Sequence, residues 1–476
     1  MTPAIRNEPE PKPRALSSHW WWQPVFAAFG VAFLAALVVG LAQGVRPFYA
    51  DSEGYWRLSS SFSVGGHFSL FDFASPQRGY LLPLVIYMLR LLSDGTFAGE
   101  SAAVTVFIVL VFALISAVLA PRLAELTWPE QSWGLLRRLA LTSLMLIFWS
   151  GDLNYPLTDF PGLATSLLAL VAVAQSETPG WMLLGGMAAG ATLDLRPAYE
   201  PLLPMLVIVV ALNWFDQRGT QHASTARRAL CAGMLIVGFA FVSLPQSLSA
   251  HRFFNTWSPV PGASTSLPGE ILTQGMSLQR QDSFERPIGT PNGIFYKDAS
   301  GNRLLNEQPG HTIMDSSQYI GLIVSHPTVM IPLLIRHIIN GLDDRYSTIY
   351  VEHLASGGYL WLRISGFLLV FLALMRLLWP EARRKLGPTR WRYPAALASC
   401  VAPSITSSME TRYMLPVVIL TYALVLAPRW PNPIGPVGAG WRRYRTVAAL
   451  TIVGLMYSAA LWHILSAIKI SLAYPV

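Results

Sequence analysis

Charged residues are scarce in this sequence: only 13% of its 476 residues are Asp, Glu, Lys or Arg, whereas 53% are hydrophobic. A soluble globular domain carries roughly a quarter of its residues as charges, and its apolar residues come in short periodic sets. Here the apolar residues come in runs close to the ~20 residues that a helix needs to cross a membrane, beginning with residues 24–44. The composition therefore excludes a soluble protein and predicts a polytopic membrane protein.

Cysteines and metal-binding motifs are also scarce. The two cysteines, Cys231 and Cys400, each lie within an apolar run, so neither a disulfide framework nor a thiolate metal site is expected. The histidines of segment 249–356 show no HxxH or HExxH spacing, which predicts no metal site there. We therefore expect no cofactor, although a divalent metal stays open.

The net charge of +8 could point to nucleic acid, but the basic residues do not form a stripe with interleaved aromatic residues. They lie instead in short connections between apolar runs, where the positive-inside rule places them on the cytoplasmic side. These basic connections are residues 121–138, 215–228, 380–392 and 429–445, together with the N-terminal tail. Membrane lipids, and no nucleic acid, are the expected surroundings.

The number of spans between two cytoplasmic segments must be even, and this parity decides which apolar runs span the membrane. If the tail and residue 121 are both cytoplasmic, the first span leads outside and only one later span can return before residue 121. The uncharged run 101–120 fills that role. Run 79–92 contains Pro83 and is bracketed by arginines, so it is expected to be an amphipathic helix in the outer interface. The same even count between the cytoplasmic connections 215–228 and 380–392 places run 318–340 outside the membrane.

The expected fold is an all-α polytopic membrane protein with about eleven transmembrane helices. Interfacial helices are expected in the first and fourth large external segments. The expected parts are a cytoplasmic tail (1–23), a membrane module (24–248) with an external loop (45–100), an external subdomain (249–356) with the interfacial helix 318–340, and C-terminal transmembrane helices (357–476). In the external subdomain, PNG and ASGN predict hairpin-like turns. His326, before Pro327, is expected to start a helix.

Ionisable residues near the outer ends of spans are costly, and such residues are usually functional or paired. On the expected topology they all fall on one side, so they could meet in one outer-leaflet cavity. They are Asp51, Glu53, Asp152, Asp159, Asp194, Arg196, Glu200, Glu410 and Arg412. Each also has an ordinary explanation, because an acid can offset a helix dipole and an arginine can pair with a neighbouring acid.

The order of these features resembles the GT-C superfamily of integral-membrane glycosyltransferases, which includes protein O-mannosyltransferases and the lipid A aminoarabinose transferase. In that family an Asp opens the first external loop, usually with Tyr four residues later; here DSEGY supplies Asp51 and Tyr55. A second acid stands in a Ser/Thr–Asp pair opening the fourth span, and Thr158 and Asp159 match it.

The segments RGYLLPLVIYML, LRPAYEPLLP, SHPTVMIPLLIRH and ETRYMLP are also similar to recurrent family segments. The resemblance covers residues 24–248 well and the remainder loosely. Many relatives have adjacent Asp and Glu in the first loop, whereas Ser52 intervenes here, which leaves the role of Glu53 open.

The resemblance implies an inverting transferase that moves a hexosyl or pentosyl group from a polyprenyl-phosphate carrier to an acceptor hydroxyl. Asp51 and Asp159 are then the catalytic residues, with Asp51 as the general base and Asp159 orienting the acceptor or sharing that role. Arg412 and Arg196 are the candidates for binding the donor phosphate, because arginines bind phosphate oxygens bidentately. The implied supporting residues are Glu53, Tyr55, Asp194 and Glu410.

The implied location is a bacterial inner or plasma membrane, with the N-terminus cytoplasmic and the active site external or periplasmic. The sugar is not identified, and the acceptor could be a glycan, a lipid or a protein. Two other functions stay open. A transporter or flippase would place its charged residues near the bilayer midplane. A glycan ligase would have its dominant external loop late in the chain and use Arg and His, which the 249–356 segment allows.

Overall fold

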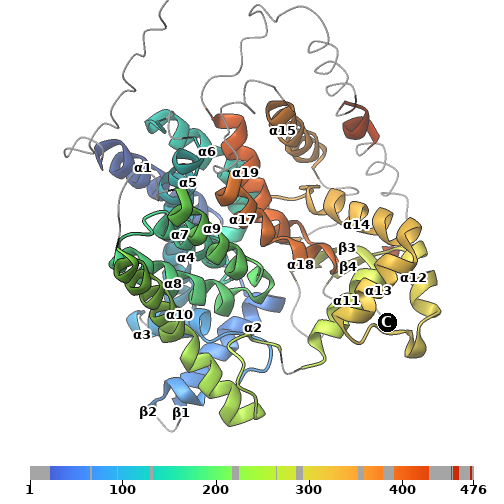
Figure 1. The fold of residues 1–476 in the computed structure, drawn as a ribbon, viewed down its shortest axis with the longest axis horizontal. Helices are drawn as coiled ribbons and strands as arrows, with labels where there is room; N and C mark the ends of the chain where they lie inside the picture. Colours follow the sequence, from blue (N-terminus) through green and yellow to red (C-terminus); the bar gives the residue numbers. More distant parts are fainter. Residues whose placement is uncertain are drawn as a thin grey trace, which may run out of the picture.

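The computed structural model describes residues 22–64, 67–93, 95–128, 132–216, 224–263, 265–285, 293–351, 359–378, 391–427, 452, 454–459 and 472–473. Helices dominate this part of the chain, and the helices of the N-terminal half pack side by side in Figure 1. They are α1 (Trp22–Ala42), α2 (Ala50–Leu58), α3 (Leu81–Leu92), α4 (Phe97–Ala113), α5 (Ala120–Thr127), α6 (Leu135–Trp149), α7 (Asp159–Val173), α8 (Pro179–Leu195), α9 (Leu202–Asp216) and α10 (Thr225–Phe254).

The C-terminal half adds shorter helices and a small sheet. Its helices are α11 (Leu267–Ser277), α12 (Ala299–Asn306), α13 (Ser316–Ser325), α14 (Pro327–Gly341), α15 (Leu360–Leu378), α17 (Arg392–Ser399), α18 (Ala402–Ile405) and α19 (Leu415–Leu426). The strands of the whole chain are β1 (Ser63–Val64), β2 (His67–Phe68), β3 (Leu278–Phe284), β4 (Gly293–Lys297), β5 (Tyr350–Val351) and β6 (Leu472–Ala473).

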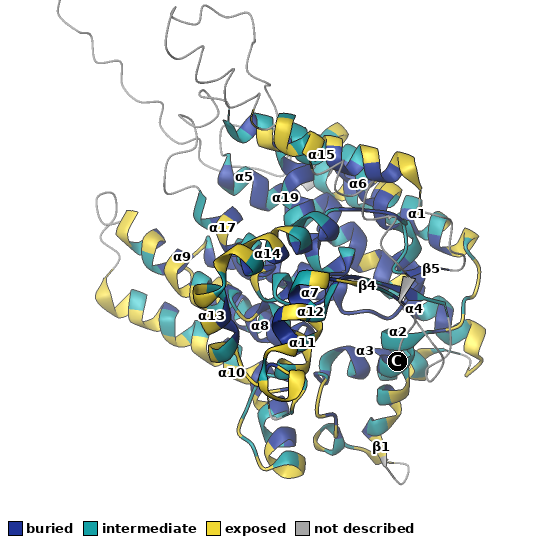
Figure 2. Ribbon diagram, turned by 90° about the vertical axis from the view of Figure 1, so that its right-hand side faces the viewer, coloured by how far each residue is buried: buried dark blue, intermediate teal, exposed yellow. Residues whose placement is uncertain are grey.

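Five helices in the described part of the chain are long and apolar enough to cross a membrane, and a bent pair could make a sixth. The five are Pro24–Ala42, Phe97–Thr127, Pro197–Asp216, Thr225–Phe254 and Leu360–Leu378. Large apolar side chains such as Leu34 on α1 and Phe241 on α10 are exposed, as expected where helices face lipid. Figure 2 shows exposed residues along α10. The chain is therefore an integral membrane protein.

The number of spans and their sidedness stay predictions. Three further apolar helices, Leu81–Leu92, Asp159–Val173 and Thr411–Leu426, are shorter than a span needs. Most of the tail 1–23, of connections 380–392 and 429–445 and of the last apolar run lies outside the described residues.

The buried helix α7 forms the centre of the membrane bundle, and nearly all its residues are buried. Next to it, α8 and α10 approach closely through glycines. A Cβ added at Gly186 would lie 2.0 Å from the Leu235 carbonyl oxygen, and one at Gly238 would lie 2.1 Å from the Leu183 carbonyl oxygen. Only glycine allows this backbone approach, which is a common way for membrane helices to pack without large side chains.

The fold departs from the all-α prediction, because β3, β4 and β5 of the external subdomain form a four-stranded sheet with β6 from the C-terminal end, in the order β5-β3-β4-β6. Strands β3 and β4 are antiparallel and β3 and β5 are parallel. The PNG turn falls largely on residues 286–292, which lie outside the described residues, but the paired strands on either side agree with a hairpin. The turn predicted at ASGN is wrong: these residues begin α12, because the Asp298 side chain caps the helix by accepting from the Gly301 N–H at 2.8 Å.

Two apolar runs are broken where the sequence predicted single helices. Run 318–340 forms α13 and α14, which meet at an angle of 115°. His326 is the N-cap residue of α14, as predicted, and Pro327 disfavours a helical conformation at the residue before it. The apolar run 393–408, which is counted among the eleven transmembrane helices expected from the sequence, is divided into α17 and α18, so neither piece is long enough to cross a membrane.

Candidate active site

The first segment of the site is the start of α2, where Asp51 lies in the first helical turn. The next residue, Ser52, is fully buried and caps this helix: its hydroxyl accepts from the Tyr49 N–H at 2.9 Å and donates to the Tyr49 carbonyl at 2.7 Å. The Ser52 N–H donates to the Tyr350 hydroxyl at 3.2 Å, which joins α2 to β5. The serine that separates Asp51 from Glu53 therefore has a structural role in fixing Asp51.

Asp51 lies between two guanidinium groups. One carboxylate oxygen accepts from Arg412 at 2.7 Å, and the other pairs with Arg78, whose guanidinium lies over the Tyr55 ring at 4.5 Å from the centroid. Burial raises the pKa of Asp51, but the two arginines outweigh burial and hold that pKa well below its ordinary value. About a third of each side chain is exposed (32% for Asp51 and 27% for Arg78), so this pair is the accessible edge of the site.

The second acid, Asp159, begins α7 and pairs with Arg196, which follows the end of α8. Its Oδ2 atom has no hydrogen-bond partner among the described residues, and Arg412 Nη1 lies 3.8 Å away. The ordinary explanation for Arg196, an ion pair with the neighbouring Asp194 or Glu200, is not found among the described residues. Arg196 lies instead between two aromatic rings, with its Cζ 5.2 Å from the centroids of both Tyr199 and Tyr413.

Arg412 lies at the centre of these contacts. Besides Asp51 and Asp159 it contacts Glu410, with Nε 2.7 Å from a carboxylate oxygen, and its Cζ lies 5.4 Å from the Tyr413 ring centroid. We name the resulting group the open cluster; it consists of Asp51, Arg78, Asp159, Arg196, Glu410 and Arg412. The structure thus brings the four leading residues predicted from the sequence into direct or nearly direct contact.

Two predicted supporting residues lie outside the open cluster. Glu53 pairs with Arg57 one turn along α2. Asp194 accepts hydrogen bonds from the backbone N–H groups of Tyr80 at 3.3 Å and Leu81 at 2.9 Å, so it caps the start of α3. Sequence reasoning also missed Arg78, although this residue immediately precedes the predicted interfacial helix and follows Asp51 in the same external loop.

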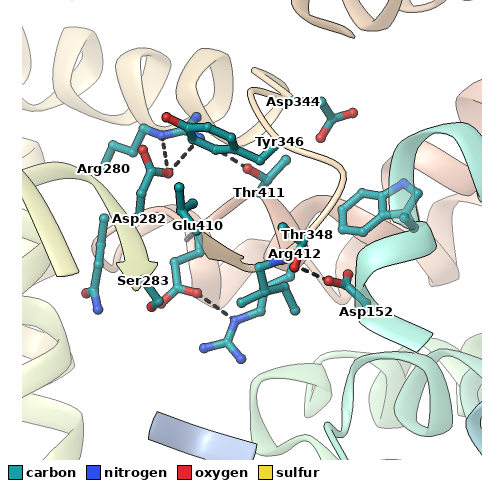
Figure 3. Close-up of a pocket in the computed structure, with 14 residues that line it drawn as sticks. Asp152, Arg280, Asp282, Ser283, Asp344, Tyr346, Thr348, Glu410, Thr411 and Arg412 are labelled. Atoms are coloured by element: carbon teal, nitrogen blue, oxygen red, sulfur yellow. Dashed lines mark hydrogen bonds and ion pairs between the residues drawn. The ribbon is translucent and has the colours of Figure 1, made fainter. Parts of the chain in front are cut away.

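A cavity of about 30 Å³ adjoins Arg412 and Glu410 on the side of the external subdomain (Figure 3). Its wall includes Asp152 from the turn before α7, Asp282 from β3, and Thr348 from the segment before β5. Burial raises the pKa of Asp152 well above its ordinary value, although its Oδ1 atom accepts from the Ile349 N–H at 2.9 Å. Asp152 was noted in the sequence as one of the outer acids but was given no role.

A second group of charges lies behind this cavity and is almost completely buried. We name it the sealed cluster; it consists of Arg280, Asp282, Asp343, Arg345 and Arg363. Asp343 pairs with Arg345 and with Arg363 at 2.7 Å each, and Arg280 lies 3.8 Å away. Arg280 also contacts Asp282 at 2.7 Å. The cluster joins β3, the residues after α14, and α15.

No three Asp, Glu, His or Cys side chains are placed to hold a metal ion in the described part of the chain.

No family model matches the chain, and no curated protein matches its sequence. Two solved structures of an archaeal oligosaccharyltransferase from Archaeoglobus fulgidus are similar. One, in the apo form, is 12% identical with a TM-score of 0.46. The other, AglB in complex with an inhibitory peptide and a dolichol-phosphate, is 13% identical with a TM-score of 0.44. Each match covers 96% of this chain and 57% of the other, so the chain spans little more than half of those proteins. A likeness at these scores assigns neither a fold nor an activity.

Proposed function

We propose that this protein is a GT-C-type glycosyltransferase that moves a hexosyl or pentosyl group, with inversion, from a polyprenyl-phosphate carrier to an acceptor hydroxyl on the outer face of a bacterial inner or plasma membrane. One observation carries this proposal: Asp51 lies between Arg78 and Arg412 at the accessible edge of a membrane-helix bundle. Arginines at such an edge suit a lipid-linked phosphate, and a carboxylate in contact with them suits proton transfer.

Three carboxylates and three guanidinium groups make up the open cluster, so their formal charges cancel before any donor binds. A phosphate that binds Arg412 and Arg78 therefore competes with Asp51 for the same N–H donors. As these ion pairs loosen, the cause of the low pKa of Asp51 is removed, and its pKa rises toward the ordinary value. Donor binding thereby turns Asp51 from an ion-pair partner into an effective general base.

In the transfer step, the acceptor oxygen forms a bond to the anomeric carbon while the bond from that carbon to the phosphate oxygen breaks. The electron pair stays on the phosphate, where Arg412, Arg78 and Arg196 stabilise the negative charge. The acceptor proton goes to Asp51. Asp159 holds Arg196 and lies 3.8 Å from Arg412, so it orients both arginines. One displacement with one base gives inversion at the anomeric carbon.

The test is to incubate the purified full-length protein with a panel of polyprenyl-phosphate hexoses and pentoses and with glycan, lipid and peptide acceptors. We expect at least one donor to be consumed, with the anomeric configuration of the product inverted by NMR. Consumption of no donor with any acceptor class, or a product with retained configuration, would contradict the proposal.

A further inference from the structure

Four buried polar atoms of the residues that line the cavity beside Arg412 have no hydrogen-bond partner among the described residues: Trp149 Nε1, Asp282 Oδ2, Thr348 Oγ1 and Arg412 Nε. Arg412 Nε still has an ion-pair partner, because it lies 2.7 Å from Glu410. The other oxygen of Asp282 accepts from Arg280 at 2.8 Å, whereas Arg345 Nη1 lies 4.0 Å from Oδ2. Asp282 is only 7% exposed. Because an unpartnered buried polar atom costs free energy, these atoms favour a ligand that completes their hydrogen bonds.

The cavity wall is held by backbone contacts around Gly151. Its N–H donates to the Ser347 carbonyl at 2.8 Å, and the next residue, Asp152, accepts from the Ile349 N–H at 2.9 Å. A Cβ at position 151 would lie 2.3 Å from Thr348 Cβ, so only glycine lets these two segments meet. Thr348 and Asp152 are thus fixed in one wall before any ligand arrives.

The size and lining of the cavity indicate the chemistry of that ligand. A water molecule needs about 10–15 Å³, so a cavity of about 30 Å³ has room for roughly two hydroxyl-sized groups. The rings of Trp149 and Tyr346 line the same space as the carboxylates (Figure 3). A single serine or threonine hydroxyl could donate to Asp282 Oδ2 and accept from Thr348, but it would fill only about half of this space. Two neighbouring hydroxyls on the edge of a sugar ring would satisfy both, with the ring face against an aromatic side chain.

We infer that this cavity binds a vicinal diol of a carbohydrate acceptor, with Asp282, Thr348 and Asp152 as its hydrogen-bonding residues. The inference rests on the proposed glycosyl transfer for its biological role. Arg412 lines the cavity and also contacts Asp51, so an acceptor sugar held there lies beside the arginine assigned to the donor phosphate. The three residues position the acceptor and select a sugar over a peptide; they do not carry out the chemical step.

The direct test measures binding without any donor. Full-length protein in lipid nanodiscs is mixed with a set of methyl hexosides and pentosides, with a serine-containing peptide as the competing class, and binding is followed by saturation-transfer NMR. We expect at least one methyl glycoside to bind in preference to the peptide. Thr348→Val and Asp282→Asn each weaken that binding at least about tenfold, because the first removes the hydroxyl and the second replaces an accepting carboxylate oxygen by an amide group that donates. Asp72→Asn, whose side chain pairs with Arg252 at a distant exposed site, leaves binding unchanged.

Thr348→Val keeps the side-chain shape and touches no ion pair, so it is informative even if Asp282→Asn lowers the melting temperature. Where transfer is active, both variants raise the acceptor KM at least about tenfold and leave the donor Kd unchanged. If no donor is ever consumed but Thr348→Val abolishes sugar binding, the cavity assignment stands and the glycosyltransferase proposal fails. Preference for the peptide, no sugar binding, or wild-type binding by both variants overturns the inference.

Discussion

The open and sealed clusters are built from the same residue types but differ in how far their charges are exposed. In the sealed cluster Asp343 is fully buried and contacts three arginines, and Arg280 donates further hydrogen bonds to the carbonyls of Asn340 at 2.7 Å and Asp343 at 2.9 Å. In the open cluster Asp51 and Arg78 are about one-third exposed. Each cluster keeps one carboxylate oxygen without a hydrogen bond among the described residues, Asp159 Oδ2 in the open cluster and Asp282 Oδ2 where the sealed cluster borders the cavity.

This difference separates structural from functional charges. A buried network whose pairs are all internal mainly specifies how elements join, here β3 with α14 and α15. A network with an exposed edge can exchange an internal partner for a ligand. The following variants test that separation, from the largest expected effect to the smallest.

Asp343→Asn should have the largest effect, because it leaves three buried arginines without their shared carboxylate. Removing one partner of a buried ion pair costs about 3–5 kcal/mol. We expect a large fall in melting temperature and in the yield of folded protein in detergent. A variant as stable as the wild type would show that the sealed cluster does not hold the fold together.

Arg412→Ala should weaken binding of a lipid-linked donor by about tenfold to a hundredfold, since charge-assisted hydrogen bonds contribute ~1.5–3 kcal/mol. Titration with a polyprenyl-phosphate sugar measures the effect, and acceptor affinity should change less. Arg57→Ala is the matched control, because Arg57 pairs only with Glu53 among the described residues. Equal losses of donor and acceptor affinity would argue against a phosphate role for Arg412.

Asp344→Asn should stabilise the protein, in contrast to the change at its neighbour Asp343. Burial, assisted by Asp343, raises the pKa of Asp344 well above its ordinary value. The folded state then binds the proton more tightly than the unfolded state, so wild-type stability falls as pH rises from about 4 through the raised pKa. The variant lacks this loss, so its melting temperature should exceed that of the wild type by a few degrees, and by more at higher pH. A gain that shrinks with rising pH would contradict this assignment.

Glu53→Gln should have the smallest effect. Glu53 is half-buried and pairs with the exposed Arg57 four residues along α2, and pairs at this spacing contribute about 0.3–0.5 kcal/mol. We expect turnover within about twofold of the wild type and an unchanged melting temperature. A large loss of turnover would place Glu53 in the site after all.

The sequence predicted the contents of the open cluster better than it predicted the folding of the external subdomain. Asp51, Asp159, Arg196 and Arg412 could be grouped because the charge pattern assigned them one side of the membrane, and the family resemblance added their order. Arg78 was missed because an arginine beside an interfacial helix also suits a lipid-headgroup anchor. Its contact with Asp51 depends on the fold of the intervening external segment.

The sealed cluster and the small sheet could not be predicted in this way. Arg280, Asp343 and Arg363 are far apart in the sequence, and their pairing depends on how β3 meets the ends of α14 and α15. The helix at ASGN was missed because Gly and Asn favour turns, whereas the cap formed by Asp298 decides the local structure. The break in run 393–408 was missed because composition alone does not show where an apolar run stops being helical.

The most direct test of the central claim is the turnover of Asp51→Asn with a polyprenyl-phosphate sugar that the wild type uses, measured together with its melting temperature. Loss of a general base costs about 10²–10⁴-fold in rate. The claim predicts a loss of that size with little change in melting temperature, because Asp51 belongs to the exposed edge of the open cluster. Wild-type turnover by Asp51→Asn would contradict it.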